Sequence, residues 1–450
     1  MSDPAPLVKV PKQYYPASNM ANKTLALLFV AYVLSFIDRQ ILSVLIGPIR
    51  EAFSISDFQF SLLHGFAFAI FYTVLGLPIG WAADRFNRKR IIIFGVFFWS
   101  IATCLCALTK NFSALFAARV GVGVGEAALS PPAYSMLSDY FSPEKLPAAM
   151  ALYSMGITIG GGLAYIIGGG VYQYFASLGP ILLPVVGELQ AWQLTFVAVG
   201  APGFIVVLLL GYIDEPPRLG RVNSSATSTL AGIEEVLQHL RRFKRAYLGH
   251  IVGVSILSIV GYGTMAWFIE FLFRSFAMSK AESGGIFGGM FIVIGSIGTF
   301  AIAALTRHLA HRGYTDASMR IIMIVALAMI IPATLSPLMP TAYLALALAS
   351  GTIFCQFGYF GVATAALQLI TPNQMRAQVS ALLLFATNLI GLTIGPAVVA
   401  FCTDFIFQDD SKLNYSLSLV VVIFAPLAAL VVWSGLKDFR RALAARASWQ

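Results

Sequence analysis

The sequence predicts an all-α membrane protein with twelve transmembrane helices, arranged as two six-helix bundles. Hydrophobic residues make up 58% of the 450 residues. Charged residues make up only 11%, whereas a soluble domain carries about 25%. Apolar runs long enough to cross a bilayer recur from Leu25 to Leu436. Lipid is therefore the main solvent of this chain.

The apolar runs divide evenly between the two halves of the chain. Crossing a hydrocarbon core about 30 Å thick takes about 20 apolar residues in a helix, because lipid cannot satisfy exposed backbone groups. The runs of the first half are Leu25–Ile46, Ser61–Trp81, Ile91–Leu108, Phe112–Leu137, Ala148–Tyr172 and Trp192–Tyr212. Those of the second half are Tyr247–Phe273, Ile286–Thr306, Ile321–Leu338, Tyr343–Ile370, Val379–Phe401 and Leu417–Leu436. The first run is too long for the core of a signal peptide, so we expect it to remain in the mature protein.

A polar segment, residues 213–246, separates the two sets of runs. It contains Pro216-Pro217 and a short amphipathic pattern around Ile233–Phe243. We expect residues 1–212 to form the N-terminal bundle and residues 213–246 a cytoplasmic linker with a short helix. Residues 247–450 would form the C-terminal bundle and a basic cytoplasmic tail. This layout is typical of transporters whose halves move about a central site.

The distribution of basic residues predicts the orientation. With both termini in the cytoplasm, the cytoplasmic segments hold 22 of the 29 Lys and Arg residues and the outer segments hold five. The positive-inside rule favours this arrangement. We therefore expect a multi-pass protein of the inner cell membrane. Because the basic residues are scattered over short loops, the net charge of +9 does not indicate a nucleic-acid-binding face.

No cofactor or metal site is predicted. The four cysteines lie within apolar runs and lack zinc-ligand spacing. The five histidines are dispersed, whereas an enzyme would need a nucleophile with its base or a metal-ligand cluster. An enzyme or a receptor is therefore the weaker interpretation. The expected partners are membrane lipids, protons and a small amphipathic substrate, with the chain acting as a monomer.

Three charged residues inside the predicted helices are the main candidates for function. Asp38 lies in the first helix, and Arg119 and Glu126 lie in the fourth. Asp38 and Arg119 are each about 11–12 Å below the outer membrane surface, so they can meet if the two helices touch. Glu126 is two turns further inward on the face of Arg119. Gly123 lies between them and thins that face.

Charges at this depth cost several kcal/mol, so they usually face a cavity or a partner. Our hypothesis is that Glu126 and Asp38 bind and release protons. Arg119 would alternate between the two carboxylates or bind an anionic substrate headgroup, because it stays protonated. The alternative is a permanent pair that only fixes helices one and four. Arg39 would line the outer vestibule or pair elsewhere.

A second cluster, GWAADRFNRKR, joins the second and third helices on the cytoplasmic side. Gly80 would permit close helix approach, and Asp84 could face a helix N-terminus or a basic partner. The charges of Arg85 and Arg88 would stay in water or pair as a cytoplasmic gate. Composition alone would make this a solvated loop.

The second half holds no counterpart of Arg119 or Glu126 in its tenth helix. Its most notable acid is Glu270, which lies among aromatic residues. This asymmetry favours a lipid-like substrate over a sugar, which would need hydrogen-bonding groups from both halves. The residues proposed to line the cavity are Arg39, His64, Tyr134, Tyr262, Trp267, Phe268 and Glu270. For the aromatic residues, packing or an interfacial belt is the alternative.

Three segments of the sequence carry a family resemblance. GWAADRFNRKR resembles the signature between helices two and three of the major facilitator superfamily, although Asn87 replaces its usual glycine. FIDRQILSVLIGPI and ARVGVGVGEAALSPPAYSMLSDYF resemble the Spinster group of that superfamily, whose eukaryotic members export sphingolipid or lysophospholipid signals. The resemblance implies that Asp38, Arg119 and Glu126 couple proton and substrate movement. It also implies a cytoplasmic gate at Asp84 and Arg85.

The sequence thus predicts a secondary transporter that works by alternating access and is proton-coupled, with a lipid-like or amphipathic substrate. The alternative is a proton-linked or uncoupled carrier of small organic anions or sugar acids.

Overall fold

The computed structural model describes residues 15–142, 144–184, 187–218, 227–372 and 375–445. Within these residues, twelve helical segments are long and apolar enough to cross a membrane, as predicted. The segments are Ser18–Ser43, Asp57–Gly76, Arg88–Cys106, Phe112–Tyr140, Leu146–Leu178, Ala191–Gly211, Lys244–Phe276, Lys280–His311, Ala317–Leu338, Ala342–Leu369, Gln378–Phe407 and Asp410–Ala444.

The first six segments pack together as the N-terminal bundle. The helices that make up most of its spans are α1 (Ser18–Gln40), α4 (Ala67–Arg85), α5 (Arg88–Cys106), α6 (Phe112–Glu126), α7 (Ser130–Tyr140), α8 (Leu146–Leu178), α9 (Ala191–Gly200) and α10 (Pro202–Gly211). Two short helices, α2 (Ile46–Phe53) and α3 (Asp57–Ser61), follow α1. Strands β1 (Ile181–Leu183) and β2 (Gly187–Leu189) form an antiparallel hairpin in which Leu182 faces Glu188. The sequence did not predict this hairpin.

The last six segments form the C-terminal bundle. Its helices are α12 (Lys244–Phe276), α13 (Lys280–His311), α14 (Ala317–Leu335), α15 (Ala342–Leu369), α16 (Arg376–Phe401) and α17 (Leu413–Ala444). Helix α12 packs against α16 and α17, and α14 packs against α15 and α17. An additional helix, α11 (Thr227–Arg242), lies between the bundles in sequence, within the segment predicted as the linker.

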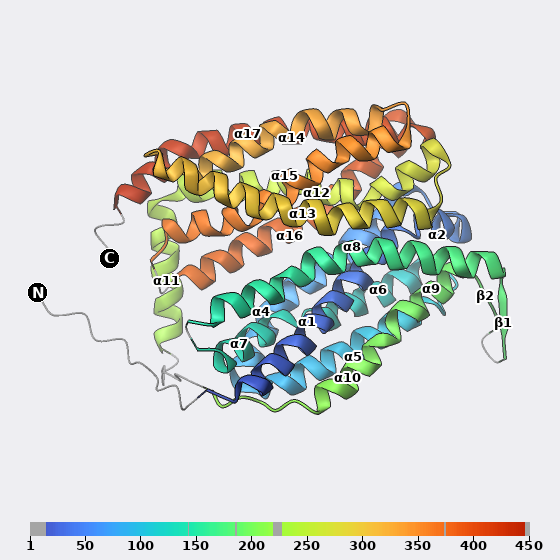
Figure 1. Cartoon of the computed structure of the whole chain (residues 1–450), viewed down its shortest axis with the longest axis horizontal. Helices are drawn as coiled ribbons and strands as arrows, with labels where there is room; N and C mark the ends of the chain where they lie inside the picture. Colours follow the sequence, from blue (N-terminus) through green and yellow to red (C-terminus); the bar gives the residue numbers. More distant parts are fainter. Residues whose placement is uncertain (1–14, 143, 185–186, 219–226, 373–374, 446–450) are drawn as a thin grey trace, which may run out of the picture.

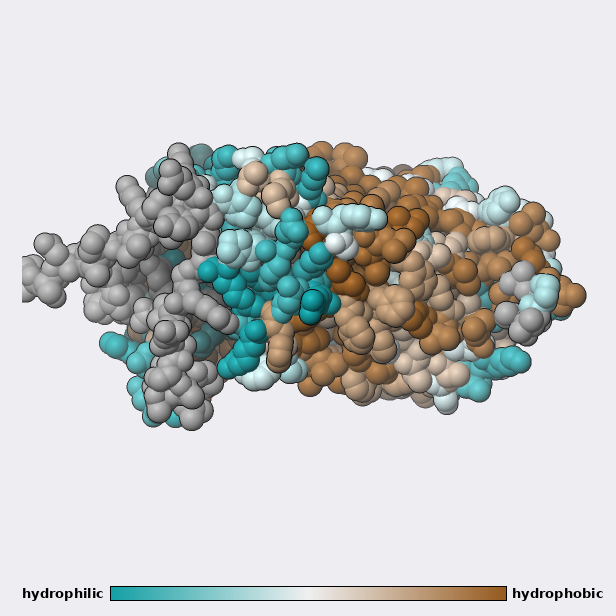
Figure 2. All heavy atoms as spheres, turned by 90° about the horizontal axis from the view of Figure 1, so that it is seen from below, coloured by the Kyte–Doolittle hydropathy of each residue, from teal (hydrophilic) through white to brown (hydrophobic). Residues whose placement is uncertain are grey.

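The molecule has two distinct ends, which we name by their landmarks. Helix α11, the start of α1 and the end of α17 lie at one end, the linker end, and β1–β2 lies at the other, the hairpin end (Figure 1). Figure 2 shows hydrophobic residues over the middle of one face, with hydrophilic residues gathered toward the linker end and in smaller patches at the hairpin end. This surface fits a protein embedded in a bilayer with both ends in water.

The two bundles are packed tightly in the half of the molecule near the hairpin end. Helix α8 contacts α13, and the π-helical turn Leu62–Phe66 contacts α16. A Cβ atom on Gly162 or Gly288 would collide with main-chain oxygen of the other glycine, and one on Gly65 would collide with the Leu392 carbonyl. Only glycine allows the backbones to approach this closely. Toward the linker end α8 and α13 diverge (Figure 1).

Candidate functional site

The first element of the site is an ion pair between helices α1 and α6. Arg119 Nη1 lies 3.1 Å from Asp38 Oδ1, and the two residues are 0% and 2% exposed. Thr103 of α5 donates its hydroxyl hydrogen to Asp38 Oδ2. Asp38 and Arg119 therefore meet at one level, as their depths in the sequence predicted.

A second ion pair lies beside the first and corrects the prediction for Glu126. Arg39 Nη2 donates to Glu126 Oε2 at 2.8 Å, and Ser35 donates its hydroxyl to the same oxygen at 2.7 Å. The sequence predicted a ladder from Arg119 to Glu126 along one helix. Instead, Arg39 is rotated about 100° from Asp38 around α1, so it reaches Glu126 across the helix interface.

Arg39 is fixed by aromatic rings as well as by its carboxylate partner. Its guanidinium carbon lies 4.6 Å, 4.5 Å and 4.7 Å from the ring centroids of Phe36, Phe68 and Tyr72. Only 5% of Arg39 is exposed, so it does not line an open outer vestibule. Cation–π contacts of this kind strengthen when the cation is removed from water.

The two pairs leave several buried polar atoms without a hydrogen-bond partner among the described residues. These atoms are Nε and Nη2 of Arg119, Nε of Arg39 and Oε1 of Glu126. An unsatisfied buried group costs about 1–3 kcal/mol. The site therefore retains unused donors on Arg119 and an unused acceptor on Glu126.

The backbone around these residues is irregular. Helix α6 ends at Glu126, and α7 starts at Ser130 with prolines in its first turn. On the opposite side, His64 lies within the π-helical turn Leu62–Phe66, is 5% exposed, and is within electrostatic reach of Arg119. Such turns are frequent at functional sites. The sequence predicted His64 as a residue lining the cavity, and this role stays a prediction because its side chain is buried in this conformation.

Tyrosines cover the side of the charged set that faces the linker end. Tyr32 stacks on Tyr153 with ring centroids 4.5 Å apart, and Tyr134 packs edge-on against Tyr153 at 5.3 Å. Tyr134 is 37% exposed, and its role in lining the cavity stays a prediction. Sequence reasoning missed Tyr32 and Tyr153. Tyr32 could have been found, because it lies seven residues before Arg39 on the same helical face.

Tyr262 is the predicted lining residue from the C-terminal bundle. It is partly buried and donates its hydroxyl to Asn388 Oδ1 at 3.3 Å. It lies within electrostatic reach of Arg39 of the other bundle. Tyr262 and Asn388 therefore present hydrogen-bonding groups near the charged set, and Asn388 was missed by the sequence prediction.

Trp267 and Phe268 are packing residues rather than lining residues. Each is only 1% exposed. Trp267 donates its indole N–H to the Pro396 carbonyl at 3.0 Å, and Phe268 stacks on Phe287 with centroids 4.8 Å apart. Their prediction as cavity residues is wrong, because these rings fill the tight core near the hairpin end.

The predicted cytoplasmic gate lies within the N-terminal bundle and the start of the linker. Arg88 is 1% exposed and forms ion pairs with Asp139 and with Glu215 Oε1, the latter at 2.8 Å. Arg85 lies over the Trp81 ring at 4.1 Å. Arg88 is thus buried rather than left in water. The ion pairs of the described residues do not connect this cluster to the C-terminal bundle in this conformation.

The structure corrects the prediction for Gly80, whereas the one for Asp84 stays a prediction. The nearest atom to a Cβ built on Gly80 is Pro131 Cβ at 3.9 Å, so no close helix approach depends on this glycine. The main-chain carbonyl of Asp84 accepts a hydrogen bond from Arg218, whereas its carboxylate makes no ion pair with the described residues. Their role in a gate stays a prediction.

The buried arginine of this cluster should dominate its contribution to stability. We expect Arg88→Ala to lower the free energy of unfolding by about 3–5 kcal/mol, because it removes the cation that compensates two carboxylates. Arg85→Ala should cost only about 0.5–1 kcal/mol, because it loses an exposed cation–π contact. Thermal unfolding of the detergent-solubilised variants measures the difference. Equal melting temperatures would contradict the burial argument.

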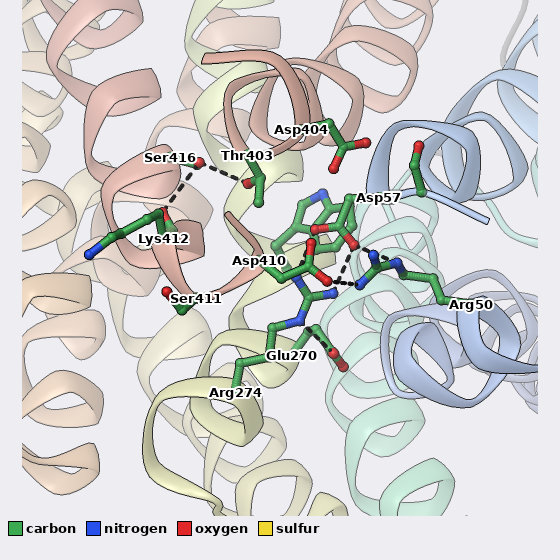
Figure 3. A network of polar contacts seen from close by, with 12 residues as sticks. Arg50, Asp57, Glu270, Arg274, Thr403, Asp404, Asp410, Ser411, Lys412 and Ser416 are labelled. Carbon is green, nitrogen blue, oxygen red and sulfur yellow. Dashed lines mark hydrogen bonds and ion pairs between the residues drawn. The ribbon is translucent and has the colours of Figure 1, made fainter. Parts of the chain in front are cut away.

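An ion network joins the two bundles at the hairpin end (Figure 3). Asp57 of the N-terminal bundle accepts hydrogen bonds from Arg274 of the C-terminal bundle at 2.7 and 2.8 Å. Arg50 lies 3.0 Å from Asp57 and 2.9 Å from Asp410. Asp57 is fully buried, so two cations compensate it in a water-poor position.

Glu270 belongs to the same network. It is 2% exposed and pairs with Arg274 at 2.9 Å and Lys280 at 2.5 Å. The prediction that Glu270 lines the cavity is wrong, because two basic residues from the predicted outer loops enclose it. Carboxylate oxygens of Asp57, Asp404 and Asp410 lie within 4.8 Å of one another, and Arg50 and Arg274 supply the positive charge there.

Comparison with known proteins assigns this architecture. Residues 28–396 match the family model described as Major Facilitator Superfamily. An MFS-type efflux pump of Mycolicibacterium smegmatis is 27% identical over 421 residues, which cover 91% of each chain. A probable L-galactonate transporter of Escherichia coli is 23% identical over 84% of this chain and 82% of its own length. A solved structure, a bacterial homologue of the human lysosomal transporter Spinster in an inward-facing and unoccupied conformation, has a TM-score of 0.81. It is 27% identical, and the match covers 95% of this chain and 99% of that one.

Proposed function

Because the chain belongs to the Major Facilitator Superfamily, we propose that it is a proton-coupled carrier that moves a lipid-like or amphipathic anion by alternating access. The chain is a multi-pass membrane transporter with twelve spans, and its bacterial relatives agree with the expected inner membrane. We propose the proton as the driving ion, an amphipathic anion as the substrate, and the charged residues of α1 and α6 as the groups that couple them.

The observation that carries the proposal is the pair of buried salt bridges on α1 and α6. Asp38 with Arg119, and Glu126 with Arg39, form a set whose charges cancel. A buried carboxylate changes its protonation when its cationic partner moves or is neutralised. A proton on either carboxylate leaves the set positive. An anionic headgroup on the unused donors of Arg119 restores neutrality, so proton and anion binding depend on each other.

Access to this set would open at the linker end. The glycine packing and the ion network connect the bundles near the hairpin end. The partly exposed Tyr134 lies toward the linker end. With the orientation expected from the basic residues, this arrangement is inward-facing, and outward opening requires the hairpin-end network to break.

The charge distribution favours an amphipathic substrate. The described charged residues of the C-terminal bundle lie near the ends of its helices. The central region of that bundle therefore offers mainly apolar and aromatic surface, which suits a hydrocarbon chain, while Arg119 suits an anionic headgroup. A sphingosine-1-phosphate transporter of Danio rerio, 27% identical over 61% of this chain, supports this reading. The alternative, a carrier of sugar acids, is supported by the L-galactonate transporter relative.

Transport into proteoliposomes tests the proposed substrate class. Labelled lysophospholipid and labelled galactonate are offered separately, each with and without a pH gradient. We expect the gradient to accelerate lysophospholipid movement, and excess galactonate to leave that movement unchanged. Gradient-driven galactonate transport without lysophospholipid transport would establish the sugar-acid alternative instead.

The hairpin-end network should hold the bundles together. We expect Asp57→Asn to speed amide hydrogen exchange in α2 and α3 by about tenfold or more. Removing one partner from a buried charge network costs about 3–5 kcal/mol, which favours separation of the bundles at this end. Asp409→Asn is the matched control, because Asp409 is exposed and its carboxylate accepts a hydrogen bond from the nearby Ser411 N–H, which an asparagine side chain can also accept. Exchange by mass spectrometry that is equally slow in both variants would show that this network is not a gate.

A further inference from the structure

A groove between α14 and α17 at the linker end carries charged residues that take no part in the proposed transport mechanism. Its volume is about 400 Å³. The lining includes Arg320, Met323, Trp433, Ser434, Lys437 and Arg440. From its shape and charge we propose that this groove binds the headgroup of an anionic phospholipid of the surrounding bilayer.

Helical periodicity builds the groove. Trp433, Lys437 and Arg440 follow one another at intervals of four and three residues, which places them on one face of α17. Arg320 and Met323 lie three residues apart on α14. The two helices pack against each other along the outer side of the C-terminal bundle (Figure 1). The groove therefore faces the bilayer rather than the central site.

The groove has an excess of positive charge. Asp316 is 2% exposed and accepts hydrogen bonds from Arg320 at 3.1 and 3.2 Å. Arg440 Nε lies 3.8 Å from the same carboxylate, and its side chain remains 52% exposed. Lys437 is exposed and has no ion-pair partner among the described residues. Three cations thus face one carboxylate.

The neighbouring aromatic residue indicates that the ligand has an apolar part. Trp433 is 64% exposed on the outer surface of a membrane-spanning helix, one turn from Lys437 toward the membrane interior. Tryptophan is enriched at the membrane interface, and basic pockets between transmembrane helices bind anionic headgroups. A phospholipid matches both the basic and the apolar part of the groove. Its phosphate lies against Lys437 and Arg440, and its acyl chain passes Trp433 and Met323. A free phosphate would contact only the basic part.

Fluorescence quenching tests the proposal on the full-length protein in phosphatidylcholine vesicles. Phosphatidylglycerol with brominated acyl chains is added, and the signal of Trp433 is isolated by subtracting the Trp433→Phe variant. We expect stronger quenching by brominated phosphatidylglycerol than by brominated phosphatidylcholine at equal mole fraction. Lys437→Gln and Arg440→Gln should each weaken the preference about fivefold, since a basic residue near the surface contributes about 1 kcal/mol.

The control variant is Arg307→Gln, which removes an exposed cation at the same end but outside the groove. It should keep the wild-type preference. Equal quenching by the two brominated lipids, or an unchanged preference in both groove variants, would overturn the proposal. Displacement of phosphatidylglycerol by millimolar glycerol phosphate would also overturn it and assign the groove to a soluble anion.

Discussion

Arg119→Lys is expected to lower the rate of transport by about 100-fold while leaving the protein folded. Lysine keeps the positive charge, and its ammonium can still reach Asp38. It cannot replace the planar fork of the guanidinium, which places one nitrogen on Asp38 and leaves two nitrogens for an anion. Losing a charge-assisted hydrogen bond costs about 1.5–3 kcal/mol, and about 2.7 kcal/mol corresponds to 100-fold.

The measurement is initial transport in proteoliposomes at matched protein content, with Arg90→Lys as the control. Arg90 is exposed in the first turn of α5, so its replacement by lysine should leave transport unchanged. Size-exclusion chromatography and melting temperature check that Arg119→Lys is folded. Wild-type activity in this variant would show that Arg119 only fixes helix α1 to helix α6, as in the permanent ion pair that the sequence left as the alternative.

Glu126→Gln is expected to abolish the effect of a pH gradient on transport. Glutamine retains the shape and accepts the hydrogen bonds of Ser35 and Arg39, but it carries no titratable proton. Substrate would still exchange across the membrane, because Arg119 and Asp38 are unchanged. Accumulation driven by the gradient should fall to the level reached without one. Glu144→Gln, which removes an exposed carboxylate of the same bundle, should accumulate substrate like the wild type.

The sequence predicted the helices well because the hydropathy of each run decides whether it crosses the membrane. Runs of apolar residues must cross the bilayer, and all twelve predicted runs are found. The ends were less certain: the predicted run Ile286–Thr306 lies within a helix of 32 residues, Lys280–His311. That helix continues past the apolar run on both sides because polar residues are tolerated once the chain reaches the interface.

Contacts between helices were predictable only where the depth of each residue in the membrane was enough to identify its partner. Depth along the membrane normal was enough to bring Asp38 and Arg119 together. The partner of Glu126 depended on how α1 is rotated relative to α6, because this rotation decides whether Arg39 reaches Glu126. The spacing of residues in the sequence does not give that rotation. The hairpin-end network was missed for the same reason, since Asp57 and Arg274 are 217 residues apart in sequence.

The proposed mechanism requires that proton movement through Glu126 is coupled to substrate movement. Its most direct test is the internal pH of proteoliposomes, followed with a trapped pH-sensitive dye after substrate is added without any imposed gradient. We expect the internal pH to change in step with substrate flux in the wild type. In Glu126→Gln the same substrate flux should produce no pH change. A pH change of equal size in both proteins would contradict proton coupling through Glu126, as would substrate flux in the wild type without any proton movement.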